Sequence, residues 1–166
     1  MLFRSLVNGS DLKLGGAFTL GDNETGTGSM TLDGSSKLTV TTGSLNPFTA
    51  GQSVTLNNGG LIDMTTGSTS ANDTLTVNGN YNGNGGGLAL QSVLGSDGSP
   101  SDLLVVSTGT ISGTTPISVS NLAGPGAETV QDGIQVVRTI NGASGAGTHF
   151  TDRKSTRLNS SHHPDL

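Results

Sequence analysis

Few side chains in this sequence have the type and spacing that catalysis requires. His149 is the single histidine before residue 152, and no nucleophile or acidic partner stands at a recognisable spacing from it. Ser144 lies in the glycine-rich run 142–147, but the Gly-x-Ser-x-Gly pattern of a nucleophile elbow is absent there. Isolated residues of this kind are usually structural. We therefore expect no catalytic residue and predict that the chain is not an enzyme.

Carboxylates suggest a second chemistry, calcium binding through oxygen ligands. The candidates are Asp97, Asp102 and the segment 22–24. Their spacing matches neither an EF-hand loop nor the repeats of calcium-binding β-rolls, whereas aspartate commonly caps turns. We expect turn-capping aspartates, no metal site and no cofactor. The glycines of 83–87 lack the lysine of a phosphate-binding loop, so a turn is expected there as well.

Charge and composition argue against several classes of partner. The formal net charge is −5, from 12 acidic and 7 basic residues, which disfavours nucleic-acid binding. The sequence contains no cysteine, and no stretch approaches the ~20 apolar residues of a membrane-spanning helix. The first residues lack the apolar region of a secretory signal peptide. We expect no nucleic-acid partner, no disulfide and no direct membrane insertion, and an export signal, if there is one, outside this chain.

Short β-strands must position these side chains. Gly accounts for 27 of the 166 residues and hydrophobic residues for 31%, which is too few for a thick core. Leu, Val, Ile and Thr form short strings that favour strands, and Gly or Ser interrupts nearly every window that could form a helix. The strands are predicted at 28–32, 37–40, 53–56, 61–64, 74–77, 88–90, 103–106, 117–119 and 134–137.

Comparable apolar positions recur at intervals in the twenties, as from Leu32 to Val54 and from Val54 to Leu75. Such a period indicates a β-solenoid, in which each coil contributes a few short strands and stacks about 4.8 Å from the next. Inward Leu, Val and Ile then form a thin apolar column. Tyr81, the single tyrosine, is expected to pack over a glycine of a neighbouring coil rather than to face a ligand. The predicted fold class is all-β, a β-solenoid with open ends.

The segment 57–60 leaves a rival architecture open. Its sequence is Asn-Asn-Gly-Gly, and Asn-Gly between alternating strands is a strong signal for a hairpin. An antiparallel sandwich is therefore the alternative to the solenoid. In a solenoid the same residues turn a corner, where Asn and Gly supply positive φ.

A series of motifs in the second half of the chain resembles the C-terminal passenger region of pertactin-like autotransporters. The motifs occur in the same order as in that family and span about residues 73–150, while residues 6–72 resemble ordinary passenger coils. They read DTLTVNGNY at 73–81, GGGLAL at 85–90, SPSDLLVV at 99–106, GTTPISVSNL at 113–122, GPGAETV at 124–130 and GIQVV at 133–137.

The resemblance implies a right-handed parallel β-helix that reaches the bacterial cell surface, or is secreted, through the periplasm and the outer membrane. It implies a C-terminal outer-membrane β-barrel of the same polypeptide as partner, which this sequence does not include. It also implies that the segment 102–137 acts as an autochaperone, which folds first and templates the coils before it. The residues expected to form this folding template are Leu103, Val105, Ile117, Val119, Ile134 and Val136.

Two functions follow from the resemblance. The first is a non-catalytic stalk and autochaperone that presents an adhesin or another virulence factor. The alternative is a solenoid that binds directly, either to a host glycan or to itself through Thr and Asn ladders; a piece of a secreted enzyme ranks third. For the first function, polar replacement of Leu103, Val105, Ile134 or Val136 should slow surface display more than the same change at Leu38 or Val40.

The two ends differ from the middle of the chain. Residues 152–166 hold three of the seven basic residues and two of the three histidines. The tetrapeptides at 2–5 and 152–155 can also be encoded by reverse-complementary DNA that resembles a sequencing adapter. We therefore predict a non-native leader at 1–5, a passenger fragment at 6–151 with its autochaperone-like part at about 102–150, and a non-native tail at 152–166.

Overall fold

The computed structural model describes residues 4–6 and 9–152, and the secondary structure of these residues consists of strands and turns. The strands are β1 (Arg4–Leu6), β2 (Asp11–Leu14), β3 (Ala17–Leu20), β4 (Ser29–Leu32), β5 (Lys37–Val40), β6 (Gly43–Pro47), β7 (Val54–Asn58), β8 (Leu61–Asp63), β9 (Thr74–Asn84), β10 (Gly87–Ser92), β11 (Leu103–Asn121), β12 (Val137–Ile140) and β13 (Phe150–Asp152). Within the same residues, no helix is long and apolar enough to cross a membrane.

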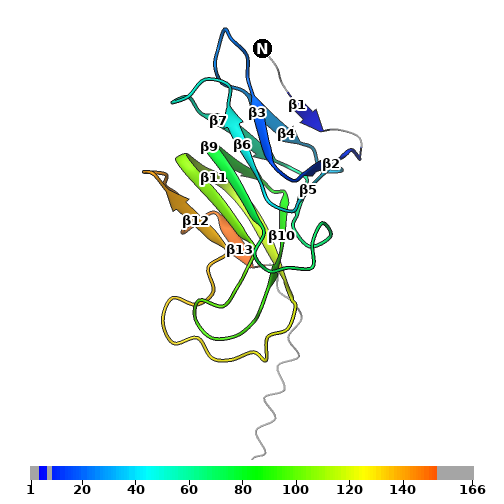
Figure 1. Ribbon diagram of the computed structural model, residues 1–166, viewed down its shortest axis with the longest axis vertical. Helices are drawn as coiled ribbons and strands as arrows, with labels where there is room; N and C mark the ends of the chain where they lie inside the picture. Colours follow the sequence, from blue (N-terminus) through cyan, green and yellow to red (C-terminus); the bar gives the residue numbers. More distant parts are fainter. Residues whose placement is uncertain (1–3, 7–8, 153–166) are drawn as a thin grey trace, which may run out of the picture.

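The chain winds from coil to coil, and its strands stack into three faces, within each of which neighbouring strands are parallel (Figure 1). Face 1 contains β1, β4, β7, the second half of β9 and the middle of β11. Face 2 contains β2, β5, β8, β10, the end of β11 and β13. Face 3 contains β3, β6, the first half of β9, the start of β11 and β12. Every pairing between two of these strands is parallel, so the predicted β-solenoid is confirmed and the antiparallel sandwich is wrong.

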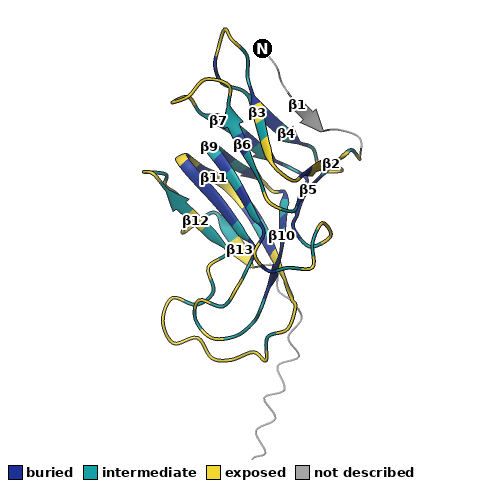
Figure 2. Cartoon of the chain, viewed as in Figure 1, coloured by how far each residue is buried: buried dark blue, intermediate teal, exposed yellow. Residues whose placement is uncertain are grey.

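The inward side chains of each face form a ladder that runs through the coils, as Figure 2 shows by the buried residues along the stacked strands. Face 1 stacks Met30, Leu56, Tyr81 and Ile111; face 2 stacks Leu12, Leu38, Ile62, Leu88 and Ile117; and face 3 stacks Phe18, Leu45, Val77 and Val106. Each fully buried aliphatic side chain contributes roughly 1.5–3 kcal/mol. The column they form is thin, as the low hydrophobic content predicts, and stability has to come from adding coils.

The two longest strands continue around the corners of the solenoid. β9 begins on face 3 and ends on face 1, and β11 contributes one stretch to each of the three faces. Within β11 the register shifts between Thr108 and Ile111, and Thr108 and Gly113 adopt positive φ values of 65° and 71°. A β-bulge of this kind bends the strand. β11 therefore carries all three faces of one coil without a break.

The corner at 57–60 differs in detail from its prediction. Neither Asn57, Asn58, Gly59 nor Gly60 has positive φ. A Cβ at Gly60 would overlap the backbone of the preceding coil at Asp33 and Ser36. Glycine is required here because the backbones approach closely, and not because the turn is left-handed.

Several strands differ from the predicted set. The strand expected at 134–137 begins only at Val137, as β12. Sequence inspection also missed β1, β2, β3, β6 and β13. The predicted non-native origin of residues 1–5 and 152–166 stays a prediction, and residues 1–3 and 153–166 lie outside the described residues.

Candidate functional site

A buried chain of polar side chains links three successive coils. Tyr81 of β9 is fully buried, and its hydroxyl lies 3.0 Å from Asn58 Nδ2 of β7 and 2.9 Å from Thr115 Oγ1 of β11. Asn58 Nδ2 also donates to the Gly87 carbonyl oxygen, at 3.2 Å. Burial raises the pKa of Tyr81, so the phenol stays neutral and can both donate and accept. The link is directional, and a shift of one coil along the solenoid would break it.

The surroundings of Tyr81 fit its ring closely. Its ring centroid lies 6.0 Å from that of Phe150 in β13, with the two planes inclined by 26°. A Cβ at Gly83 would overlap the Thr115 hydroxyl, so glycine at this position leaves room for the polar link. Tyr81 is thus a fully buried core residue, and the ring stacked against it belongs to Phe150. The expected packing of Tyr81 over a glycine of a neighbouring coil stays a prediction.

Asp102 forms a second buried connection, at the corner before β11. It is fully buried, and its two carboxylate oxygens accept hydrogen bonds from the Asp73 amide at 2.9 Å and the Gln91 amide at 2.7 Å. Burial raises the pKa of Asp102, and the nearby Asp73 carboxylate acts in the same direction, while the two amide hydrogen bonds oppose them. The carboxylate therefore fixes the starts of β9 and β11 relative to each other.

Asp97 fastens the long segment 122–136 to the rest of the fold. Its carboxylate accepts from the amides of Val130 at 2.8 Å, Gln131 at 3.1 Å and Gly133 at 2.6 Å. These amides, with Val130 first in importance, hold the pKa of Asp97 below its usual range. The segment contains no strand, and these three hydrogen bonds hold it against the loop that carries Asp97.

The aspartates singled out in the sequence therefore do different things. Asp22 accepts from the Glu24 and Thr25 amides and caps a turn, as expected. Local turn capping is wrong for Asp97 and Asp102, which bind amides far away in the sequence. In residues 4–6 and 9–152, no group of three or more His, Cys, Asp or Glu side chains could hold a metal ion.

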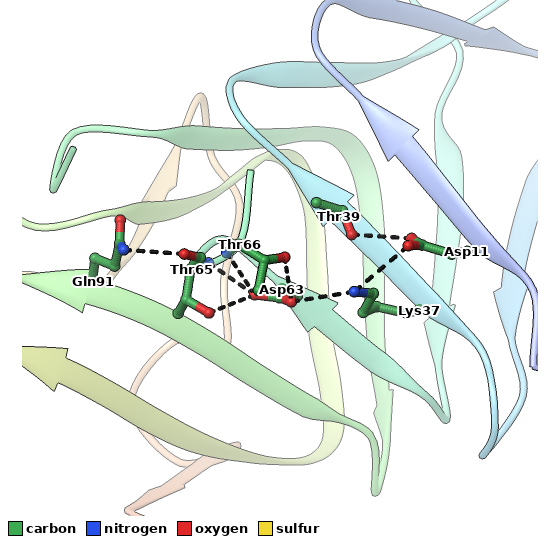
Figure 3. Close-up of polar contacts among 7 residues, drawn as sticks. All are labelled: Asp11, Lys37, Thr39, Asp63, Thr65, Thr66 and Gln91. Carbon is green, nitrogen blue, oxygen red and sulfur yellow. Dashed lines mark hydrogen bonds and ion pairs between the residues drawn. The ribbon is translucent and has the colours of Figure 1, made fainter. Parts of the chain in front are cut away.

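A polar groove lies on the outer side of face 2, between β2, β5 and the segment 64–73. Its volume is about 470 Å³, and it is lined by Asp11, Lys13, Leu14, Gly15, Lys37, Thr39, Thr41, Thr66 and Gly67. Figure 3 shows the ion pairs and hydrogen bonds beneath it. Lys37 Nζ lies 3.5 Å from Asp11 Oδ2 and 3.6 Å from Asp63 Oδ2, which joins three coils.

The comparisons with known proteins agree with the fold. The family model of the autochaperone domain type 1 matches residues 51–158, which is more than half of the chain. The chain belongs to this family. The predicted autotransporter passenger with an autochaperone region is thereby confirmed.

Three curated relatives match shorter stretches of the chain. The adhesin BmaC autotransporter of Brucella suis is 49% identical over 70 residues, which are 42% of this chain and 2% of the adhesin. The Escherichia coli proteins YdeU and YuaQ are 44% and 37% identical over 73 and 89 residues, which are 44% and 54% of this chain and 15% and 6% of those proteins. The chain thus spans a small part of the curated relatives it matches.

The structure places the predicted template residues of this autochaperone domain unevenly. Leu104 and Val106 are the fully buried members of the core in this part of β11, one residue out of phase with the predicted Leu103 and Val105. Leu103 is half-buried, and Val105 is buried in the outer row beside Thr76.

The other template residues lie further along the chain. Ile117 belongs to the core, whereas Val119 is 43% exposed. Ile134 and Val136 are half-buried in the segment before β12, and Val136 packs against the core. Only some of the six predicted residues therefore have the burial that an internal template needs, and the template role itself stays a proposal.

The two catalytic candidates of the sequence take part in backbone pairing of the autochaperone domain. The Ser144 amide donates to the Gly109 carbonyl oxygen at 3.1 Å, and the Ser144 carbonyl oxygen accepts from the Ile111 amide at 2.9 Å. His149 Nδ1 lies 2.7 Å from the Gly113 carbonyl oxygen, and the His149 carbonyl oxygen accepts from the Thr115 amide. Both residues extend the solenoid below β11.

Proposed function

We propose that the downstream coils, defined as residues 74–152, are the folding template of an autotransporter passenger. The upstream coils, residues 11–47, would fold onto this template. The observation that carries the proposal is the match of the autochaperone family to residues 51–158, which includes all of the downstream coils. The buried links at Tyr81 and Asp102 support it, because both fix the register between neighbouring coils.

The physical advantage of a template is that it removes a nucleation cost. A single coil cannot bury its inward side chains, so the first coil must close its loops before it gains contacts. β11 presents a continuous strand to all three faces, and each coil that follows pairs with strands already in place. Folding that starts in the downstream coils then proceeds toward the N-terminus.

The same proposal gives the chain its place in the cell. We propose a non-catalytic passenger segment at the bacterial cell surface, exported through the outer membrane with the help of a C-terminal β-barrel of the same polypeptide. The relative named an adhesin autotransporter supports this place, and the absence of cysteine suits passage of an unfolded chain. A role in presenting an adhesin is part of the proposal.

The test compares two core leucines in an intact autotransporter that carries this segment. Leu104 lies in β11 and Leu38 in β5, and both are fully buried. Each is replaced by Asn, and the surface-exposed passenger is followed after pulse labelling by its accessibility to protease. Leu104→Asn should slow the appearance of folded, protease-resistant passenger several-fold more than Leu38→Asn. Equal delays would contradict a template in the downstream coils.

A further inference from the structure

We propose that the polar groove on face 2 binds an acidic oligosaccharide, meaning a sugar chain that carries carboxylate groups. The groove lies beside the upstream coils, and most of its lining precedes the residues matched by the autochaperone family. The inference therefore concerns a second activity of the chain and does not depend on the folding-template proposal. Its volume of about 470 Å³ is in the range of small-ligand sites.

One wall of the groove is formed by the segment 64–73, and hydrogen bonds fix the first residues of this segment. Asp63 is buried and accepts from the amide and hydroxyl of Thr65 at 2.8 and 2.7 Å, and from the Thr66 hydroxyl at 2.7 Å (Figure 3). Gln91 Nε2 donates to the Thr65 carbonyl oxygen at 3.1 Å. The wall is thus fixed before any ligand arrives, which lowers the entropic cost of binding.

Further along, the same wall packs against the floor. A Cβ at Gly67 would come within 2.7 Å of Thr41 Cγ2 and 3.3 Å of Thr39 Cγ2. Across the floor, a Cβ at Gly15 would lie 3.1 Å from Thr41 Oγ1. A side chain at either glycine would crowd Thr41, so glycine at both positions leaves the space beside this threonine open.

The cation that would bind an anionic ligand is Lys13. Lys37 lies between Asp11 and Asp63, 3.5 and 3.6 Å from a carboxylate oxygen of each, so it is already paired. Lys13 is exposed and forms no ion pair within residues 9–152. The groove therefore offers one cation free to bind a carboxylate on a chain whose net charge is −5.

The remaining polar groups suit sugar hydroxyls. Thr39 donates its hydroxyl to Asp11 Oδ1 at 3.0 Å, while Asp11 Oδ2 pairs with Lys37 Nζ. The hydroxyls of Thr41 and Thr66 line the same space. The lining contains no aromatic side chain and a single large apolar one, Leu14, which is buried. A hydroxyl-rich ligand fits this lining better than an apolar peptide or a lipid, and without a stacking platform its affinity should be low.

The experiment is a titration of the full chain, labelled with ¹⁵N and followed by amide chemical shifts. The probe is an oligosaccharide of alternating glucuronic acid and N-acetylglucosamine. Its controls are a sulfated oligosaccharide and a neutral oligosaccharide of N-acetylglucosamine. We expect saturable shifts at the amides of Lys13, Thr41 and Gly67, with a dissociation constant of about 1 mM for the acidic oligosaccharide. The affinity for the neutral oligosaccharide should be at least about tenfold lower.

Matched variants decide whether the groove is responsible. Lys13→Gln should weaken binding about tenfold, the loss expected for one charge-assisted hydrogen bond, and Lys13→Arg should retain it. Arg138→Gln removes another exposed cation, on β12 and far along the chain, and should leave binding unchanged.

Four results would overturn the inference. One is the absence of shifts at these amides at concentrations of about 10 mM, ten times the expected constant. Another is equal affinity for the acidic and neutral oligosaccharides. The third is equal weakening by Lys13→Gln and Arg138→Gln, which would show attraction to positive charge in general. Preference for the sulfated chain over the carboxylated one would also contradict the carboxylate assignment.

Discussion

The upstream and downstream coils are built on the same three faces but are held together differently. Strands of the upstream coils have four or five residues and end at each corner, whereas β9 and β11 have 11 and 19 residues and continue around corners. Aliphatic side chains such as Leu38 and Leu45 fill the upstream core. The downstream core adds Tyr81, and a buried carboxylate at Asp102 reinforces its corner.

This difference affects how uniquely the register between coils is defined more than it affects the amount of buried surface. Stacked aliphatic side chains are nearly interchangeable, because Leu on Leu gains similar contacts in several registers. The hydrogen bonds that join Asn58 Nδ2, the Tyr81 hydroxyl and Thr115 Oγ1 form in this register, and a shift in register would leave these buried groups without partners. This difference supports the proposal that the downstream coils set the register onto which the upstream coils fold.

The largest difference should appear when one core side chain from each region is truncated. Tyr81→Ala removes a fully buried ring and leaves Asn58 and Thr115 short of a partner, so the free energy of unfolding should fall by about 4–5 kcal/mol. Leu38→Ala should cost about 3 kcal/mol. Urea denaturation measures both. Tyr81→Phe isolates the hydroxyl and should cost about 1–2 kcal/mol. A smaller loss for Tyr81→Ala than for Leu38→Ala would contradict the comparison.

A second comparison concerns carboxylates that bind backbone amides. Asp102→Ala leaves the buried amides of Asp73 and Gln91 without their acceptor and should lower the free energy of unfolding by about 2–3 kcal/mol. Asp33 accepts from the Ser35 amide in an accessible turn of the upstream coils, and Asp33→Ala should cost about 1 kcal/mol. Thermal and urea unfolding should rank the two variants in this order. Equal costs would remove the distinction between the two regions.

The dependence of stability on pH should have opposite signs at Asp102 and Asp63. Burial raises the pKa of Asp102, so its favourable contribution is complete below about pH 3.9, the ordinary value, and is lost as pH rises through the folded-state pKa. Although burial of Asp63 acts in the same direction, hydrogen bonds from Thr65 and Thr66 and the charge of Lys37 lower its pKa. Its contribution is present above about pH 3.9 and is lost as pH falls through the folded value.

Two variants separate these contributions. The free energy of unfolding is measured between about pH 3 and pH 6, the range that brackets the ordinary carboxyl pKa. Asp63→Asn should flatten the loss of stability on acidification, and Asp102→Asn should make that loss steeper than in the unmodified chain. If both substitutions changed the slope in the same direction, the assigned environments would be wrong.

The smallest expected effect is local. Asp97→Ala removes three amide contacts from the segment 122–136 but leaves the core intact, so it should change the free energy of unfolding least among these substitutions. Amide exchange and limited proteolysis should accelerate in 122–136 and stay unchanged in the segment 64–73. Faster exchange throughout the chain would show that Asp97 supports the whole solenoid.

The sequence predicts the solenoid well where apolar and polar residues alternate, as at 37–40 and 53–56. It fails where this signal is absent. In 103–106 all four residues are apolar, so alternation does not show which pair faces inward, and the fully buried core residues are Leu104 and Val106. Gly113 and Pro116 are unfavourable in a strand, yet β11 continues through both. Gly113 has positive φ near the end of the pairing with β9, and Pro116 pairs with Thr151 of β13.

The buried polar links could be predicted only in part. Asn58 follows Val54 and Leu56 in strict alternation, which predicts an inward side chain, although Asn-Gly at 58–59 also favours a turn. Asp102 gives no such signal, because its partners at Asp73 and Gln91 are distant and are brought close only by the stacking of coils. The groove is formed in the same way, from residues of different coils.

The central claim is that the downstream coils fold first, and a matched pair of valines tests it most directly. Val106 in β11 and Val40 in β5 are both fully buried core residues, and Val→Thr preserves their shape at a cost of about 1–3 kcal/mol. Folding and unfolding rates of the purified chain give a φ-value for each. We predict about 0.5–0.8 for Val106→Thr and about 0–0.3 for Val40→Thr. A higher φ-value at Val40 than at Val106 would contradict the account.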